Sequence, residues 1–118
     1  MTLSVGMVTV DSLDALALGR WWAEQVGGEV VQENEGWFVV VAVPGAPVQL
    51  AFQKVERPTP GKNKMHLDLV ATDLDAEVSR LEAAGADKVS DQTMETGFRW
   101  VTLADPEGNY FDVAQAES

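Results

Sequence analysis

Hydrophobic and polar positions follow the same order twice along the chain. In the first half, a segment rich in β-branched residues at 3–10 precedes a helical pattern over 13–26, where Leu18, Trp22 and Val26 recur at every fourth position. Three apolar segments separated by turn residues follow, at residues 29–32, 37–43 and 48–55. The first half therefore predicts one strand, one helix and three further strands.

The second half repeats this order after a proline-rich break that neither a helix nor a central strand would tolerate. Its pattern predicts a strand at 64–71, a helix at 74–84, and strands at 87–93, 98–104 and 109–115. The sequence thus predicts an α+β fold of two βαβββ modules. We expect a single domain over 1–118, with module 1 at 1–57, a linker at 58–63 and module 2 at 64–118.

Capping residues mark the start of each predicted helix. Asp11 and Ser12 are the expected N-cap of the first, and Thr72 and Asp73 are that of the second. The offset from Asp11 to Asp73 is 62 residues, as it is from Pro44 to Pro106. A duplicated module explains the match. Each sheet must bury one face under its helix, so we expect the other two faces to line a ligand cleft.

Composition excludes several functions. A chain of 118 residues with 46% hydrophobic content can form a core without disulfide bonds or a structural metal, and it has no cysteine. The net charge of −11 argues against nucleic acid as a partner. With no signal stretch and no apolar segment near 20 residues, we expect no membrane partner and a cytoplasmic location. Neither a Gly-x-Ser-x-Gly elbow nor a phosphate-binding glycine loop is present, which disfavours hydrolases and nucleotide binding.

The alternation of strand residues indicates which side chains face the cleft. Leu67 and Leu69 suit the helix side, so the only histidine, His66, and Asp68 face the other way. In the last predicted strand, the same reasoning turns Tyr110 and Asp112 toward the cleft. Asp112 meets His66 if the two strands adjoin.

These features resemble the vicinal oxygen chelate superfamily, which includes glyoxalase I, bleomycin-resistance proteins and extradiol dioxygenases. The resemblance rests on the double βαβββ order, on the His66 strand before DLDAEVSRLEAAGA, and on the closing DPEGNYFDV. It covers nearly the whole chain, and KNKMHLDL, GRWWAEQVG and LAFQKV are similar to a compact glyoxalase-like subgroup. The resemblance implies the fold more firmly than the function.

The resemblance also implies where a metal would bind. Metal-dependent members take one ligand from the first strand and one from the last strand of each module. His66 and Asp112 match the second module's positions, and both suit zinc, iron, nickel or manganese. In module 1 the offset of 62 puts Ser4 opposite His66, while the last strand offers Leu50 by offset, or Gln49 and Gln53 by alternation. Half of the expected site is missing, so we expect no resident cofactor.

Two of the tryptophans are candidates for the ligand cleft. Trp22 belongs to the first helix's apolar stripe, which indicates core packing, whereas Trp37 and Trp100 begin comparable strands in the two modules. This resembles bleomycin-resistance proteins, which are acidic dimers without metal chemistry that hold a large cationic aromatic drug between tryptophans. The resemblance therefore implies a homodimer. It also implies a small-molecule site whose expected residues are His66, Asp68, Asp112, Gln53, Tyr110, Trp37 and Trp100.

Three functions remain open at this point. The first is metal-independent binding of a small organic molecule, as in drug sequestration. The second is a metal-dependent lyase, isomerase or dioxygenase in which His66 and Asp112 ligate the ion. The third is a structural module whose cleft is filled by its own side chains. His66 itself has a purely structural interpretation, as a histidine paired with Asp68 or Asp112 without chemistry, and Asp105 and Asn109 fit a turn.

Overall fold

The computed structural model describes residues 5–58, 60 and 66–116. The chain divides into two compact units, Met1–Pro58 and Thr59–Ser118. The boundary falls one residue beyond the predicted end of module 1. In the described residues, no helix has the length and apolar character needed to cross a bilayer.

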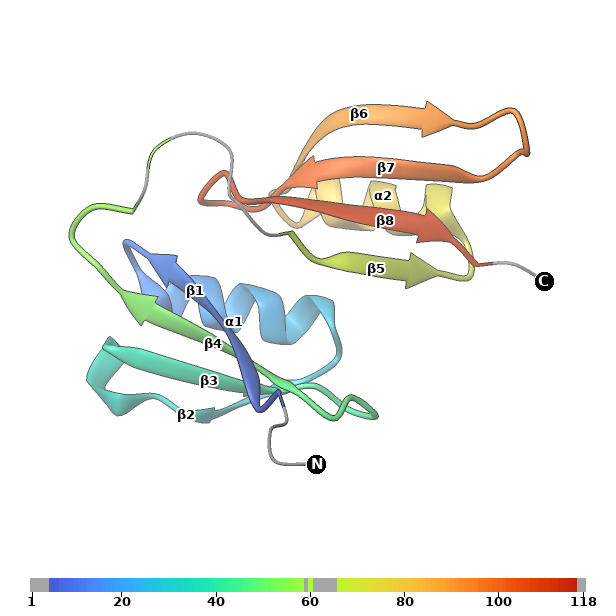
Figure 1. Ribbon diagram of the computed structural model, residues 1–118. Coiled ribbons are helices and arrows are strands. Elements are labelled where there is room, and N and C mark those ends of the chain that lie inside the picture. The colour runs from blue at the N-terminus through green and yellow to red at the C-terminus, as the bar shows by residue number, and fades with distance from the viewer. Residues whose placement is uncertain (1–4, 59, 61–65, 117–118) are drawn as a thin grey trace. The chain divides into compact units, whose positions relative to one another are not determined.

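The first unit is one βαβββ module. Its elements in chain order are β1 (Met7–Ser12), α1 (Ala15–Gln25), β2 (Glu29–Gln32), the short 3-10 turn η1 (Asn34–Gly36), β3 (Phe38–Ala42) and β4 (Gln49–Lys54). The strand order is β1-β4-β3-β2, with β1 parallel to β4 and the other pairs antiparallel. Figure 1 shows α1 against one face of this sheet.

Helix α1 packs closely on its sheet because a glycine lies at the contact. A Cβ atom at Gly19 would lie 2.7 Å from Cγ1 of Val39, so any larger residue would push the helix away. Leu18 and Trp22 of α1 are buried there together with Phe52 of β4. Burial of such side chains contributes about 1.5–3 kcal/mol each. Trp22 is therefore a core residue, as its helical spacing predicts.

The second unit repeats the module. Its elements are β5 (Asp68–Ala71), α2 (Leu74–Ala83), β6 (Asp87–Thr93), β7 (Arg99–Ala104) and β8 (Tyr110–Gln115). The strand order β5-β8-β7-β6 matches that of the first unit, again with a parallel first pair (Figure 1). Leu74, Val78 and Leu81 of α2 are buried, as are Leu103, Phe111 and Val113 of the sheet. The α+β fold with two βαβββ modules is confirmed.

The start of the first helix differs from the prediction. The N-cap is Asp14, whose Oδ1 accepts a hydrogen bond of 3.1 Å from the backbone N–H of Ala17. Strand β1 instead continues through Asp11 and Ser12, since Ser12 pairs with Lys54 of β4. The prediction of an Asp11-Ser12 cap was wrong because sheet pairing holds these residues in the strand. In the second helix, Asp73 is the N-cap as predicted.

Two strands are shorter than their sequence patterns suggest. The strand predicted at 3–10 begins at Met7, and residues 3 and 4 lie outside the described residues. The strand predicted at 64–71 begins at Asp68, with His66 and Leu67 just ahead of it. Residues 64 and 65 also lie outside the described part of the chain. His66 therefore sits where the chain enters the sheet.

Candidate functional site

Three ionisable side chains converge where β5 and β8 run side by side. Asp68 and Asp112 are direct partners in this parallel pair, and His66 precedes Asp68 by two residues. Nε2 of His66 lies 3.3 Å from Oδ1 of Asp68 and 3.4 Å from Oδ2 of Asp112. The structure thus brings together the three residues that alternation placed on one face.

The carboxylate of Asp112 is held from its other side by Thr102. These residues are partners in the antiparallel pairing of β7 with β8, and Oγ1 of Thr102 donates a hydrogen bond of 2.5 Å to Oδ1 of Asp112. Oδ2 is thereby left for His66. The side chain of Asp112 is 22% exposed, whereas that of Asp68 is 75% exposed. Asp112 is accordingly the fixed carboxylate of the pair and Asp68 the accessible one.

An open hollow of about 710 Å³ lies on this face of the second sheet. Its lining includes Asp68, Val70, Met94, Phe98, Trp100 and Asp112. The strand register arranges part of this lining in two rows across the sheet. Asp68, Asp112 and Thr102 form a polar row, and Val70, Ala114 and Trp100 form an apolar one. The rows are two residues apart along each strand, which is about 7 Å.

Aromatic side chains extend the apolar part of the hollow. The rings of Phe98 and Trp100 are tilted by 35° with centroids 5.9 Å apart. Met94 and Phe98 are exposed large hydrophobic residues, and so is Val70. Apolar side chains grouped in this way at a surface are typical of an interaction or ligand site. The hollow therefore pairs an apolar wall with a charged one.

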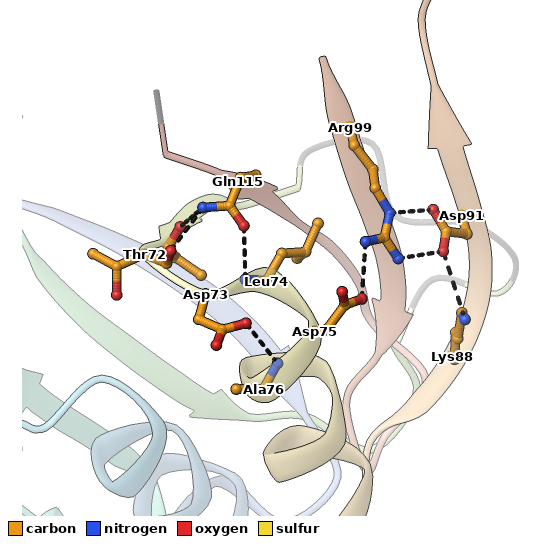
Figure 2. A network of polar contacts seen from close by, with 10 residues as sticks. Thr72, Asp73, Leu74, Asp75, Ala76, Lys88, Asp91, Arg99 and Gln115 are labelled. Atoms are coloured by element: carbon orange, nitrogen blue, oxygen red, sulfur yellow. Dashed lines mark hydrogen bonds and ion pairs between the residues drawn. The ribbon is translucent and has the colours of Figure 1, made fainter. Parts of the chain in front are cut away.

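The basic residue between the two aromatics is turned away from the hollow. Arg99 donates two hydrogen bonds to Asp91 of β6, at 2.9 and 2.7 Å, and one of 2.8 Å to Asp75 of α2. Figure 2 shows this network, which Lys88 joins through Asp91. Hydrogen bonds from Arg99 hold the pKa of the Asp91 carboxyl below its ordinary value, and both carboxylates raise the pKa of Arg99. Among the described residues that line the hollow, none is basic.

Gln115, which lines the hollow, forms hydrogen bonds with the start of helix α2. Nε2 of Gln115 donates to the carbonyl of Thr72 at 2.7 Å, and its Oε1 accepts from the N–H of Leu74 at 2.9 Å (Figure 2). The same figure shows Asp73 capping Ala76. These contacts join the start of α2 to β8, so the strand that carries Asp112 is held in place.

Four predicted site residues are not among those that line the hollow, and one of them, His66, lies beside its lining residues Asp68 and Asp112. Tyr110 begins β8 and pairs with Ala104. Gln53 and Trp37 belong to the first unit, where Gln53 is exposed near the end of β4. Trp37 is 62% exposed, and Nζ of Lys54 lies 5.1 Å from its ring centroid. Their roles in ligand binding stay predictions.

The strand registers correct the predicted correspondence between the modules. Buried Phe111 of β8 matches buried Leu50 of β4, so Asp112 corresponds to Ala51. Ala51 pairs with Thr9 as Asp112 pairs with Asp68. Thr9 therefore corresponds to Asp68, and Met7, two residues earlier, corresponds to His66.

The single offset of 62 failed because the helices and hairpins of the two modules differ in length. Ser4 lies outside the described residues, and Leu50 faces the helix. Gln49 and Gln53 lie on the same side of β4 as Ala51 and flank it. A thioether and a methyl group thus occupy the positions where the resemblance would place two metal ligands.

Sequence reasoning missed Thr102, Phe98 and Met94. Phe98, Trp100 and Thr102 are two residues apart along one predicted strand, so their side chains share a face. The prediction that Trp100 faces the cleft could have been extended to Phe98 and Thr102. Met94 lies in the connection after β6, at a position that alternation does not reach. The partnership of Thr102 with Asp112 required the β7–β8 register.

The three converging donors fit a divalent metal ion. Ligand atoms about 2.1 Å from an ion lie about 3.0–3.4 Å apart when they subtend octahedral or tetrahedral angles. The observed separations from Nε2 of His66 to the two carboxylates are 3.3 and 3.4 Å. All three donor atoms lie within 4.8 Å of one another. A nitrogen and two carboxylate oxygens are chemically suited to zinc, iron, nickel or manganese.

The DPEGN segment has a structural role. Asp105 is 3% exposed, and its carboxylate accepts hydrogen bonds of 2.9 Å from the backbone N–H groups of Glu107 and Asn109. The side-chain amide of Asn109 donates to the same carboxylate. Gly108 completes the turn with a φ of 86°. These residues shape the β7–β8 turn, as their sequence pattern predicts.

Comparison with known proteins identifies the family. The model of the glyoxalase-like domain matches residues 7–114. A search of curated proteins finds no match.

Solved structures share the fold at low sequence identity. A member of the glyoxalase/bleomycin resistance protein/dioxygenase superfamily from Sphaerobacter thermophilus is 23% identical over 97% of this chain and 98% of its own, with a TM-score of 0.74. A family enzyme from Burkholderia phytofirmans is 18% identical over 98% and 100%, with a TM-score of 0.83. Lactoylglutathione lyase from Agrobacterium tumefaciens is 17% identical over 96% and 93%, with a TM-score of 0.71. The chain belongs to the glyoxalase-like domain family.

Proposed function

We propose that this protein binds a small organic molecule in the hollow on the open face of its second sheet, without the four-ligand metal centre of metal-dependent relatives. The observation that carries this proposal is that the polar row and the apolar row of the second sheet lie side by side. A polar row containing Asp68 and Asp112 lies directly beside an apolar row containing Val70 and Trp100. Mostly apolar pockets with a few converging polar groups are typical ligand sites.

The side chains of the hollow favour a flat ligand that carries a positive charge. Asp68 and Asp112 supply negative charge to the hollow. Arg99, at the start of β7, does not neutralise them, because it forms ion pairs with Asp75 and Asp91. The rings of Phe98 and Trp100 offer an aromatic surface beside the carboxylates. An aromatic amine can contact both parts of the hollow, because its ring stacks on the aromatic side chains while its ammonium group binds a carboxylate.

A binding experiment with matched probes tests this function. 2-Naphthylmethylamine and its neutral analogue 2-naphthalenemethanol are titrated into the protein in the presence of EDTA, and binding is followed by calorimetry. We expect the amine to bind at least about tenfold more tightly than the alcohol, because one charge-assisted hydrogen bond is worth about 1.5–3 kcal/mol. Equal affinities would contradict a charged ligand class.

Variants place the binding site. Trp100→Leu is expected to weaken amine binding by about tenfold, since an aromatic contact contributes about 0.5–1.5 kcal/mol beyond its buried area. Trp21→Leu is the matched control, because Trp21 lies on α1, where its ring contacts Trp22. A loss of affinity in the control as large as that in Trp100→Leu would argue against the hollow as the site.

The convergence of His66 with Asp112 favours a second candidate function. A bound divalent ion would polarise a carbonyl or acidify a bound water, which is the chemistry that lyases, isomerases and dioxygenases require of a metal. The residues that would hold it are His66 and Asp112, with Asp68 nearby. The adjoining hollow would then orient the substrate. Turnover that needs metal and disappears in His66→Ala supports this candidate, whereas unchanged turnover in chelator removes it.

A further inference from the structure

We infer that Asp68 is a third metal ligand, and that with it the second module binds one exchangeable divalent cation through His66, Asp68 and Asp112. The superfamily pattern assigns only His66 and Asp112 to this module and takes the other ligands from the first. Here the first module offers Met7 and Ala51 at the corresponding positions. The cation would use the same two carboxylates that the proposed organic ligand meets, so the test below contains no organic ligand.

The contacts of the imidazole support a cation better than a hydrogen-bonded histidine. One nitrogen, Nε2, faces both carboxylates, at 3.3 Å and 3.4 Å. Both separations exceed the usual 2.9–3.0 Å of an N–H···O bond, and one N–H shared between two acceptors makes only a long, bent bond to each. A cation enclosed by the three atoms would accept the nitrogen lone pair and both oxygens together.

The charge of the cluster points the same way. Asp68 and Asp112 are direct partners in the β5–β8 register, and their oxygens approach within 4.8 Å as part of the group with His66. Two carboxylates so close repel each other, and a divalent ion removes that repulsion. In the described part of the chain, no Lys or Arg forms an ion pair with either carboxylate.

The strand geometry explains why Asp68 can act as this ligand. His66 and Asp68 are separated by one residue, so their side chains point to the same face of β5 and its approach. Asp68 is 75% exposed, which leaves its carboxylate free to adjust. Asp112 is fixed by its hydrogen bond from Thr102. Three protein ligands with open positions for solvent is the arrangement of exchangeable and catalytic metal sites.

A manganese titration of the full chain tests the inference without any organic ligand. Mn²⁺ is added to metal-free protein, and the free ion is measured by its electron paramagnetic resonance signal. We expect one Mn²⁺ per chain, fully released by EDTA. Asp68→Asn, Asp112→Asn and His66→Ala are each expected to weaken binding at least about tenfold, because even outer-shell changes cost that much at metal sites.

Asp87→Asn is the matched control, since it removes the same charge from the exposed start of β6. It should retain the affinity of the unmodified chain. An equal loss in Asp87→Asn and Asp68→Asn would mean diffuse attraction to an acidic surface and would overturn the inference. Unchanged binding in Asp68→Asn, or no stoichiometric binding by the unmodified chain, would overturn it as well. Amine binding in EDTA reports separately on the organic site.

Discussion

Thr102 holds one oxygen of Asp112 through a 2.5 Å hydrogen bond, and this leaves the second oxygen facing His66. The contact crosses from β7 to β8 at a directly paired position. It fixes the carboxylate that both proposed functions use. A carboxylate held in this way needs little reorganisation when it meets an ammonium group or a cation.

Replacing Thr102 with valine tests this relationship. Thr102→Val keeps the shape of the side chain but leaves Oδ1 of Asp112 without its donor. We expect the free energy of unfolding to fall by about 1.5 kcal/mol, at the low end for a hydrogen bond to a charged group because Asp112 is partly exposed. Urea denaturation measures this change. Thr93→Val, an exposed position on β6, should leave stability within about 0.5 kcal/mol.

Asp105 offers a test that separates structure from function. Asp105→Ala removes a buried acceptor of hydrogen bonds from Glu107 and Asn109. We expect stability to fall by about 3 kcal/mol, because buried donors left unpaired cost about 1–3 kcal/mol each. Asp105→Asn, which keeps one oxygen, should lose less. Naphthylmethylamine affinity of the folded variant should be unchanged, and a large loss of affinity would show that the turn takes part in binding.

The network around Arg99 predicts how stability depends on acid. The pKa of Asp91 lies below its ordinary value of 3.8, chiefly because Arg99 donates hydrogen bonds to it. A carboxyl whose pKa is lower in the folded state contributes stability above its unfolded pKa, and this contribution is lost as the pH falls through the folded one. Stability should therefore drop below about pH 4. Thermal unfolding between pH 2 and pH 6 measures it.

Two variants isolate this contribution. Asp91→Asn removes the carboxyl, and Arg99→Met removes its donor while the carboxyl stays. In each variant we expect lower stability at neutral pH and a shallower loss between pH 4 and pH 2. A curve as steep as that of the unmodified chain would show that other carboxylates govern acid unfolding.

Most of the fold could be predicted from the sequence because the modules carry strong local signals. Helical spacing identified Trp22 and Leu81 as core residues, and Asp73 was recognisable as an N-cap. The cap of the first helix was misplaced because Asp11 and Ser12 have the right residue types but are held in β1 by pairing with β4. Pairing between distant strands overrides local preference, and one sequence does not reveal it.

The candidate site was predictable in part for the same reason. Alternation within each strand turned His66, Asp68 and Asp112 toward the cleft, but their meeting required β5 to adjoin β8, which the register shows. The partnership of Thr102 with Asp112 depends on the register of β7 and β8, which hairpin length and turn geometry determine. The comparison of the modules also needed register, because a constant offset cannot follow helices and hairpins of unequal length.

Backbone amide NMR with an aromatic amine tests the central claim most directly. 2-Naphthylmethylamine is titrated into ¹⁵N-labelled protein in EDTA, and saturable changes in amide shifts are mapped onto the sheets. We predict that they centre on the rows of the second sheet, at Val70, Trp100, Asp112 and Ala114. Saturable shifts centred instead on the small pocket beside Gly28 and Pro44, or no saturable shifts at all, would contradict the account.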